Sequence, residues 1–536
     1  MSLPKNKQEE LFTAARELPD FLPIDDPMMV FGHTIYPAFT DKNFEDCYST
    51  KGRNAISPAF LACVTLLQFR ENLSDPETAE AVVRRLDWKI ALHLRLRENV
   101  SFDSSTLCYY RRRLKENGKI CLIFDKIIGL AQEKGFIKKR TKQRIDATHI
   151  ISHVNRISTT DLLFRTVKCL VEEIEKKDQE YYEKQLPEHI KERYGKQFSS
   201  FGMSKDKRAD KLAEIVEDGL YLKSLLEKIT SLKLDDLEQL EIMNTIFEEN
   251  VKITTKEIED RVFVEVEEIQ TPHQTIFDPR DTSVKLSKKG KTTWVGSKCH
   301  VVETAEKGEI NFITNMIYQR ANEDDSRIHE QVREENERRG LQPEKLFADT
   351  KYVSGAAIKD YRQGGQELMG YIQGDRSKKP EAFKLQKFNI DMHTLKAVCP
   401  AGKESLSSRL QKNGKITVSF SRATCKDCAF YQECVGQSKI RSRILCVTPS
   451  YEYILERRGK QETEAFKREM SVRAQVEGTI SEGVRFCGLR HTKYKGEDGH
   501  KFQFYMTGAA LNVKRFIKVI TKGIEIPRKT TMAYKI

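Results

Sequence analysis

The stretch Lys142–Ile151 limits the possible folds more than any other part of this 536-residue chain. It reads KQRIDATHII, and its isoleucines and threonine favour a pleated, half-buried strand. Asp146 lies within that run, after a basic stretch that extends from Lys138 to Arg144. A carboxylate in such a strand is costly unless a positive group holds it. Because a strand-end Asp is more often a turn or solvent contact, Asp146 gains a function only if the rest of the chain supplies partners.

The charge balance points to a polyanionic partner. Lys and Arg total 92 against 79 for Asp and Glu, which gives a formal net charge of +13. Such a surplus indicates nucleic acid first, although a basic solvated surface is the alternative. No run approaches the roughly eighteen apolar residues of a membrane span, and the first ten residues lack a secretory signal core. We therefore expect a cytoplasmic protein without a membrane partner, whose 12 cysteines are reduced or metal-bound.

The first 130 residues predict a small helical domain that follows an irregular, proline-rich arm of about 45 residues. Ser57–Pro58 and Ser74–Glu77 are helix-start signals, and Phe102–Leu107 caps a third helix. Short helices that end in a basic, capped one are typical of a helix-turn-helix-like DNA reader. A helical packing or dimerisation domain is the alternative. The candidate DNA-binding residues of the third helix are Arg111, Arg112, Arg113 and Lys115.

The centre of the chain alternates between helical and strand character. Residues 158–258 are rich in Lys, Glu and Leu and predict a solvated helical insertion without chemistry of its own. Strand patterns return at Arg261–Glu267, Thr293–Val302 and Ile310–Ile317. The lysine- and glycine-containing run at 288–292 is not a phosphate loop, because Lys285 stands where that motif requires glycine.

Two further acids are candidates for a site shared with Asp146. A predicted strand ends just before Asp349, and Ser354 then begins a helix, which is where α/β folds usually bind ligands. Further on, Arg473 and Glu477 are four residues apart on one predicted helical face. Other glutamates share that helix, so spacing alone does not select Glu477.

The spacing of four cysteines predicts a structural metal site within residues 392–447. The pattern places two residues between Cys425 and Cys428, which lets both thiolates face one ion, and Cys399 and Cys434 complete the group. Tetrahedral Zn²⁺ is the expected occupant in a reducing cell. His393 and Cys446 flank the group as substitute ligands, and four unrelated thiols are the alternative.

The three acids resemble those of the DDE transposases of bacterial insertion sequences. Asp146 stands in RIDATHI, Asp349 in LFADTKY and Glu477 in RAQVEG. The strings ENLSDPETAEAV, FDSSTLCYYRRRL, WVGSKCHV, RANEDD, GLRHTKYKG and ALNVKRF, together with the cysteines, resemble the insertion-sequence eleven-eighty-two group. The resemblance implies an α/β (α+β) fold with a ribonuclease-H-like mixed sheet flanked by helices. That catalytic domain would occupy residues 138–391 and 448–536, interrupted by the helical and zinc-knuckle insertions.

The same resemblance implies a mechanism. Asp146, Asp349 and Glu477 would be the catalytic residues and would bind two Mg²⁺ or Mn²⁺ ions for DNA cleavage and for attack of a 3′-hydroxyl on target DNA. The expected partners are the double-stranded terminal inverted repeats and target DNA, bound by a homodimer at the nucleoid without a nucleotide cofactor. The alternatives are a metal-dependent nuclease without strand transfer, an inactive transposase-derived DNA-binding protein and a zinc-stabilised scaffold.

The chain departs from the related transposases around the third acid. Met470 stands where they often have a tyrosine, and Val484 stands where they tend to have a lysine, with Arg485 beside it. Arg473 and Arg485 are therefore the candidates that grip a DNA phosphate near Glu477.

Overall fold

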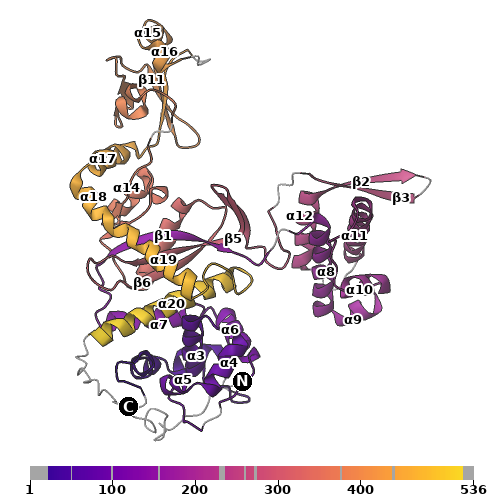
Figure 1. Ribbon diagram of the computed structural model, residues 1–536. Helices are drawn as coiled ribbons and strands as arrows, with labels where there is room; N and C mark the ends of the chain where they lie inside the picture. Colours follow the sequence, from indigo (N-terminus) through magenta and orange to yellow (C-terminus); the bar gives the residue numbers. More distant parts are fainter. Residues whose placement is uncertain are drawn as a thin grey trace, which may run out of the picture.

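The computed structural model describes residues 22–49, 51–97, 100–154, 157–228, 236–258, 261–270, 275–374, 377–436 and 441–522. Figure 1 shows a central sheet with helices on both faces, a helical unit to one side and a small unit at the far end. The expected mixed sheet flanked by helices is confirmed. No helix among the described residues is long and apolar enough to cross a membrane.

The central sheet combines antiparallel and parallel pairing. Its strand order is β4-β5-β1-β7-β8, and β6 also pairs with β5. The long strand β5 runs antiparallel to β1, β4 and β6, whereas β1, β7 and β8 are parallel. The strands are β1 (Lys142–Ile151), β4 (Lys285–Lys289), β5 (Thr292–Thr304), β6 (Ile313–Arg320), β7 (Lys345–Phe347) and β8 (Glu367–Met369).

Helices cover both faces of the sheet. Successive side chains of β1 point to opposite faces, so Ile145 and Ile150 pack under different helices. Ile145 joins the apolar cluster beneath α13 (His329–Arg338) and α14 (Gly355–Gln363). Ile150 joins the cluster beneath α7 (Leu122–Glu133) and α20 (Glu497–Lys522). Short 3-10 turns lie between the strands and these helices at Asp325–Ile328 and Thr350–Tyr352.

The N-terminal helices share one continuous core with α20 and the sheet. The expectation of an irregular arm up to about residue 45 was wrong for the described part, which is folded from Pro27 onwards. Pro27 and Pro37 lie at the starts of short helices. A backbone N–H at that position has no partner within the helix, so a proline there is compatible with the helix and does not break it. The elements are α2 (Pro27–Val30), a π-helix (Phe31–Ile35), 3-10 turns (Tyr36–Ala38, Asp41–Cys47), α3 (Pro58–Glu71), α4 (Asp75–Arg84), α5 (Leu86–Ala91) and α6 (Ser105–Glu116).

The segment after β1 forms a separate helical unit with its own core. Figure 1 shows this unit at one end of the sheet. A β-hairpin that begins at Val251 extends this unit past residue 258. Val266 of the hairpin packs against the core of the unit, and Ile276 is part of that core. Its elements are α8 (Thr159–Lys177), α9 (Gln179–Lys184), α10 (Glu188–Gly195), α11 (Lys205–Leu226), α12 (Glu238–Asn250), β2 (Val251–Ile258) and β3 (Arg261–Glu268).

The cysteine-rich segment folds around a small core of its own and then leads back to the sheet. Its three-stranded sheet has the order β11-β12-β13, and β9 pairs with β10. The elements are 3-10 turns (Glu381–Phe383, Leu385–Lys387), β9 (Asn389–Asp391), β10 (Lys396–Val398), β11 (Ser407–Leu410), β12 (Ile416–Ser419), α15 (Arg422–Lys426), α16 (Tyr431–Cys434) and β13 (Ile444–Val447). The returning helices are α17 (Tyr451–Gln461), α18 (Glu464–Met470) and α19 (Gln475–Phe486), with a 3-10 turn (Ser471–Ala474) before α19.

Candidate functional site

Two of the predicted acids lie at adjacent positions because β1 and β7 are parallel. Arg144 of β1 is paired with Phe347 of β7. Asp146 and Asp349 each follow two residues later, so the register brings them to the same level of the sheet. Each carboxylate accepts a hydrogen bond from the next backbone N–H, at 2.8 Å for Asp146 and 2.7 Å for Asp349. Both acids are therefore held in fixed orientations at the carboxyl end of β7.

The third acid reaches the same place from α19. Glu477 lies in the first turn of that helix, and its side chain is 61% exposed. Arg473, in the preceding 3-10 turn, connects the acids: its Nη2 lies 3.0 Å from Asp146 Oδ2 and its Nη1 lies 3.1 Å from Glu477 Oε1. One guanidinium thus bridges an acid of the sheet and an acid of the helix.

The electrostatics of Asp146 reflect this convergence. Burial raises the pKa of the Asp146 carboxyl, and the negative charges of Asp349 and Glu477 raise it further. The N–H of Ala147 and the positive charge of Arg473 act in the opposite direction but do not cancel the increase in pKa. Asp349 and Glu477 therefore both lie close enough to Asp146 to repel its negative charge, and a cation beside Asp146 is favourable.

The donor set suits a hard divalent cation. Carboxylate oxygens are the ligands that Mg²⁺ and Mn²⁺ prefer. Within the described ranges, no three His, Cys, Asp or Glu side chains are arranged to hold a metal ion as they stand. At the three acids, the guanidinium of Arg473 contacts two of the carboxylates. A metal ion would therefore compete with Arg473 for these oxygens.

A buried hydrogen-bond chain lies behind the Asp349 turn and was not anticipated from the sequence. The hydroxyl of Tyr352 lies 2.8 Å from His300 Nδ1, and His300 Nε2 lies 2.9 Å from Gln319 Oε1. Burial lowers the pKa of His300 to about 4, so the imidazole is neutral. Nε2–H then donates to Gln319 and Nδ1 accepts the Tyr352 hydroxyl. The only sequence signal was that both residues belong to the strings WVGSKCHV and LFADTKY.

The four predicted zinc ligands line one small cavity. Cys399, Cys425, Cys428 and Cys434 line a space of about 30 Å³ together with six other residues, among them Lys403, Phe420 and Arg443. Burial raises the pKa of the Cys434 thiol, and the neighbouring Cys425 and Cys399 contribute in the same direction, whereas Arg443 lowers the pKa. The backbone N–H of Lys403 donates to Cys399 Sγ at 3.4 Å. Four thiols that line one space match a zinc ion in kind and number of ligands, but among the described residues they are not arranged to hold a metal ion as they stand. The proposed substitutes His393 and Cys446 do not line the cavity.

The predicted DNA-binding residues differ in accessibility. Arg111 is paired with Asp75, at 2.9 Å between Nη1 and Oδ1, and lies over the ring of Tyr494. Arg113 lies over the ring of Tyr48. The remaining basic candidates are exposed at the surface of α6 or at the end of α19: Arg112, Lys115 and Arg485.

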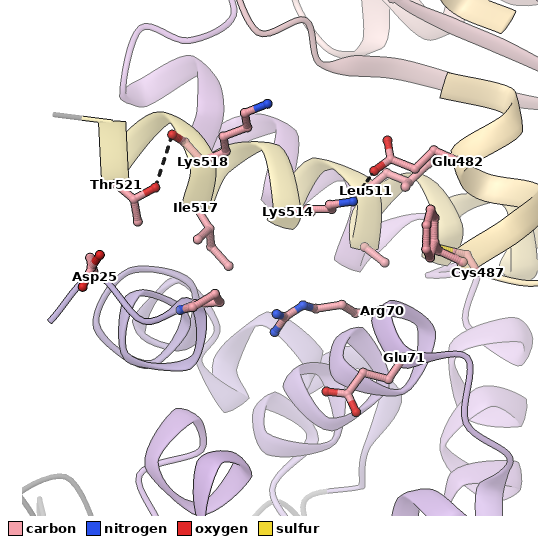
Figure 2. A pocket seen from close by; sticks show the side chains of 13 residues that line it. Asp25, Arg70, Glu71, Glu482, Cys487, Leu511, Lys514, Ile517, Lys518 and Thr521 are labelled. Carbon is pink, nitrogen blue, oxygen red and sulfur yellow. Dashed lines mark hydrogen bonds and ion pairs between the residues drawn. The ribbon is translucent and has the colours of Figure 1, made fainter. Parts of the chain in front are cut away.

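A larger pocket of about 470 Å³ lies between the N-terminal helices and the C-terminal ones. Figure 2 shows Arg70 and Glu71 on one wall and Glu482, Lys514 and Lys518 on the other. None of the predicted site residues lines it. This pocket is therefore separate from the cluster of acids.

The fold and the site together are those expected of an enzyme that acts on nucleic acid: a basic chain in which three carboxylates meet beside a mixed sheet. Residues 398–517 match the family model described as Transposase DDE domain, and residues 16–113 match the model described as Transposase domain (DUF772). Both matches support a DDE transposase without identifying its insertion-sequence group. The first match includes Glu477 and the four cysteines, whereas Asp146 and Asp349 lie outside both. No curated protein and no solved structure matches the chain.

Proposed function

We propose that this chain is a DDE transposase of an insertion sequence, of the eleven-eighty-two group, that cuts DNA at the ends of its element and joins the freed 3′ end to target DNA. The observation that carries the proposal is the meeting of Asp146, Asp349 and Glu477 across two parallel strands and one helix. These acids come from segments far apart in the sequence, and only the fold brings them together.

The sheet supports a ribonuclease-H-like core. Strand β5 pairs antiparallel with β1, β4 and β6, and β7 and β8 then add in parallel on the other side of β1. Asp146 lies on the central strand of this sheet, and Asp349 follows the neighbouring strand. The insertions leave the core at β1 and after β8, so they extend the chain without interrupting the sheet.

Each residue of the site has a proposed role in the reaction. Asp146, Asp349 and Glu477 would hold two Mg²⁺ or Mn²⁺ ions, which when bound activate the attacking oxygen and stabilise the leaving oxygen of an in-line displacement at phosphorus. Arg473 is paired with two of the acids and would contact a DNA phosphate, with Arg485 as the second candidate. The Ala147 and Thr350 amides keep two of the carboxylates oriented.

Binding of the DNA ends would involve the accessible cations of α6. Arg112 and Lys115 are exposed, whereas Arg111 and Arg113 support the helix through contacts within the protein. Joining one element to one target requires both ends together, which favours a homodimer on DNA. Zinc held by the four cysteines would stabilise the small unit between β8 and α17 and would take no part in the reaction.

The test is an excision and joining assay on DNA that carries the flanking inverted repeats, with Mg²⁺ and purified full-length protein. Asp146→Asn, Asp349→Asn and Glu477→Gln should each abolish cleavage, because each removes a metal ligand. DNA-end binding should survive, because phosphate contacts elsewhere supply it. Cleavage by any one of these variants at the rate of the unsubstituted protein would refute the proposal, and cleavage without joining would indicate a nuclease instead.

A further inference from the structure

Glu303, on β5, is a fully buried carboxylate at the centre of a charged network. Its side chain is 0% exposed. Oε1 accepts from Arg144 Nε at 2.7 Å, and Oε2 accepts from Arg515 Nη1 at 2.9 Å and from the Thr479 hydroxyl at 2.7 Å. Such a group is tolerated only when its charge is compensated and its oxygens are bonded. Both conditions are met here by partners from three different elements.

Arg144 connects this network to the strand of Asp146. The two residues are two positions apart on β1, so their side chains lie on the same face of the sheet. The Arg144 guanidinium also donates from Nη1 to the backbone oxygen of Val472 at 3.1 Å and to Gln475 Oε1 at 2.6 Å. Val472 and Gln475 flank Arg473, which contacts Asp146. Arg144 therefore holds the turn before α19 against the strand that carries the first acid.

Thr479 connects the network to the helix of Glu477. It lies two residues further along α19 and is buried, whereas Glu477 is exposed towards the other acids. The Thr479 hydroxyl donates to Glu303 and accepts from Arg515 Nη2 at 2.6 Å. Arg515 comes from α20 and also donates to the Asn311 backbone oxygen at 2.9 Å. The position of α19 along the sheet is thus fixed from its buried side as well as from its first turn.

We propose that Glu303, through Arg144 and Thr479, is a positioning residue that sets the separation between Glu477 on α19 and Asp146 on β1. This inference rests on the proposed function of the three acids. A helix that carries a single metal ligand must be held within a fraction of an ångström of its working position. The apolar contacts of α19 have no preferred direction, so they do not by themselves fix its position along the sheet. Hydrogen bonds to a buried carboxylate are directional and do fix that position.

The test uses a substitution that removes one hydroxyl and preserves shape. Thr479→Val deletes the link between α19 and Glu303 in the full-length protein. We expect Mn²⁺ affinity, measured by calorimetry without DNA, to fall roughly tenfold, the usual effect of losing a group that holds a metal ligand in place. The Mg²⁺ concentration needed for half-maximal cleavage should rise by a similar factor, and DNA-end binding should not change. Thr479→Ser keeps the hydroxyl and should restore both metal-dependent values.

Thr507→Val is the matched control. Thr507 lies on α20, is also fully buried and packs near α19, but its hydroxyl has no hydrogen-bond partner among the residues that the structure describes. It should therefore behave like the unsubstituted protein. Gln475→Ala is a second variant. Gln475 is exposed, and its replacement removes one contact of Arg144, so this variant should also weaken Mn²⁺ binding.

The outcomes separate the two proposals. If Thr479→Val and Gln475→Ala bind Mn²⁺ and respond to Mg²⁺ like an active unsubstituted protein, the positioning role is refuted and the proposed function stands. If Thr507→Val weakens Mn²⁺ binding as much as Thr479→Val, the effect is one of packing, and the positioning role is again refuted. If the unsubstituted protein neither binds Mn²⁺ nor cleaves DNA, the proposed function fails, and the inference fails with it.

Discussion

At the scale of single residues, Arg473 decides how three acids can coexist. Burial raises the pKa of the Asp146 carboxyl, and the negative charges of Asp349 and Glu477 are part of that increase, so all three effects favour protonation of Asp146. Arg473 lies between Asp146 and Glu477 and offsets that repulsion. The same positive charge opposes a divalent cation at these oxygens. Arg473 should therefore stabilise the metal-free protein and compete with the metal ion.

Replacing Arg473 separates these two effects. Arg473→Gln should tighten Mn²⁺ binding about fivefold, which corresponds to about 1 kcal/mol, because a competing cation is removed. DNA cleavage should nevertheless slow, because the proposed contact with a DNA phosphate is lost. Calorimetry and the cleavage assay measure the two effects. Arg468→Gln, at an exposed position on α18, is the control; weaker Mn²⁺ binding by Arg473→Gln would contradict the prediction.

Burial lowers the pKa of His300 to about 4, which makes the stability of the protein depend on pH. Between its ordinary pKa of about 6.5 and the folded value, the unfolded chain binds the proton and the folded chain does not. Stability contributed by the neutral imidazole is therefore present above pH 6.5 and is lost as the pH falls towards 4. The loss should reach about 2 kcal/mol at pH 5.

Thermal melting of the unsubstituted protein and of His300→Gln between pH 7 and pH 5 measures this contribution. His300→Gln should melt lower at pH 7, because the hydrogen bond to Tyr352 is disturbed, but its melting temperature should fall less on acidification. Equal pH dependence of the two proteins would show that His300 does not resist protonation.

The sequence identified these site residues unequally. Strand patterns made Asp146 and Asp349 candidates, because an acid within or just after an apolar strand can be recognised locally, and the resemblance then gave them a role. Glu477 was selected only by resemblance, since several glutamates share its predicted helix. Glu303 could not be found, because its partners Arg144 and Arg515 are 159 and 212 residues away and nothing local marks a strand glutamate as buried.

At the scale of elements, the boundaries that mattered most were those that local pattern predicts least well. The sequence predicted that Arg473 and Glu477 share one helical face, but the structure has α18, a 3-10 turn and α19 in succession, with Arg473 in the turn. That break turns Arg473 towards Asp146 and starts a new helix just before Glu477. Tertiary contacts from Arg144 to this turn account for the break, and no helix propensity reveals them.

The cysteine-rich element carries its own prediction. Removing zinc with a chelator should lower the melting temperature of the protein, because metal binding contributes directly to the stability of a small metal-bound unit. Cys428→Ser should abolish stoichiometric zinc, measured by atomic absorption. Cys446→Ser is the control, because Cys446 is exposed on β13 and does not line the cavity. Purified protein without zinc and a melting curve unaffected by chelator would refute the assignment.

At the scale of the whole molecule, the N-terminal helices and the central sheet share one apolar core. The predicted boundary at residue 130 falls within α7, whose buried face packs against α20 and the sheet. Asp125 of α7 is also bonded to Arg338 and Arg339 at the end of α13. Because the N-terminal helices are packed against the sheet, DNA bound at α6, as proposed, would lie in a defined position relative to the acids.

We expect part of the surplus of positive charge to contact DNA phosphates, and the hairpin between β4 and β5 offers a direct test. Lys288, Lys289 and Lys291 at its tip are exposed and, among the described residues, form no ion pair within the protein. A cation without an acidic neighbour is available to a DNA phosphate. Replacing all three with Gln should weaken DNA binding and reduce the slope of log K against log salt by about 2 to 3.

The size of the change in slope distinguishes direct contact from a general loss of charge. A triple substitution at Lys196, Lys205 and Lys207, exposed in the helical unit, removes the same net charge. Fluorescence anisotropy at a series of salt concentrations measures the DNA affinity of both triple variants. If binding depended only on the overall charge, both variants would lose affinity equally. A reduced slope confined to the hairpin variant would mean that its lysines displace counterions from DNA, because counterion release reports phosphates contacted and not the total charge of the protein.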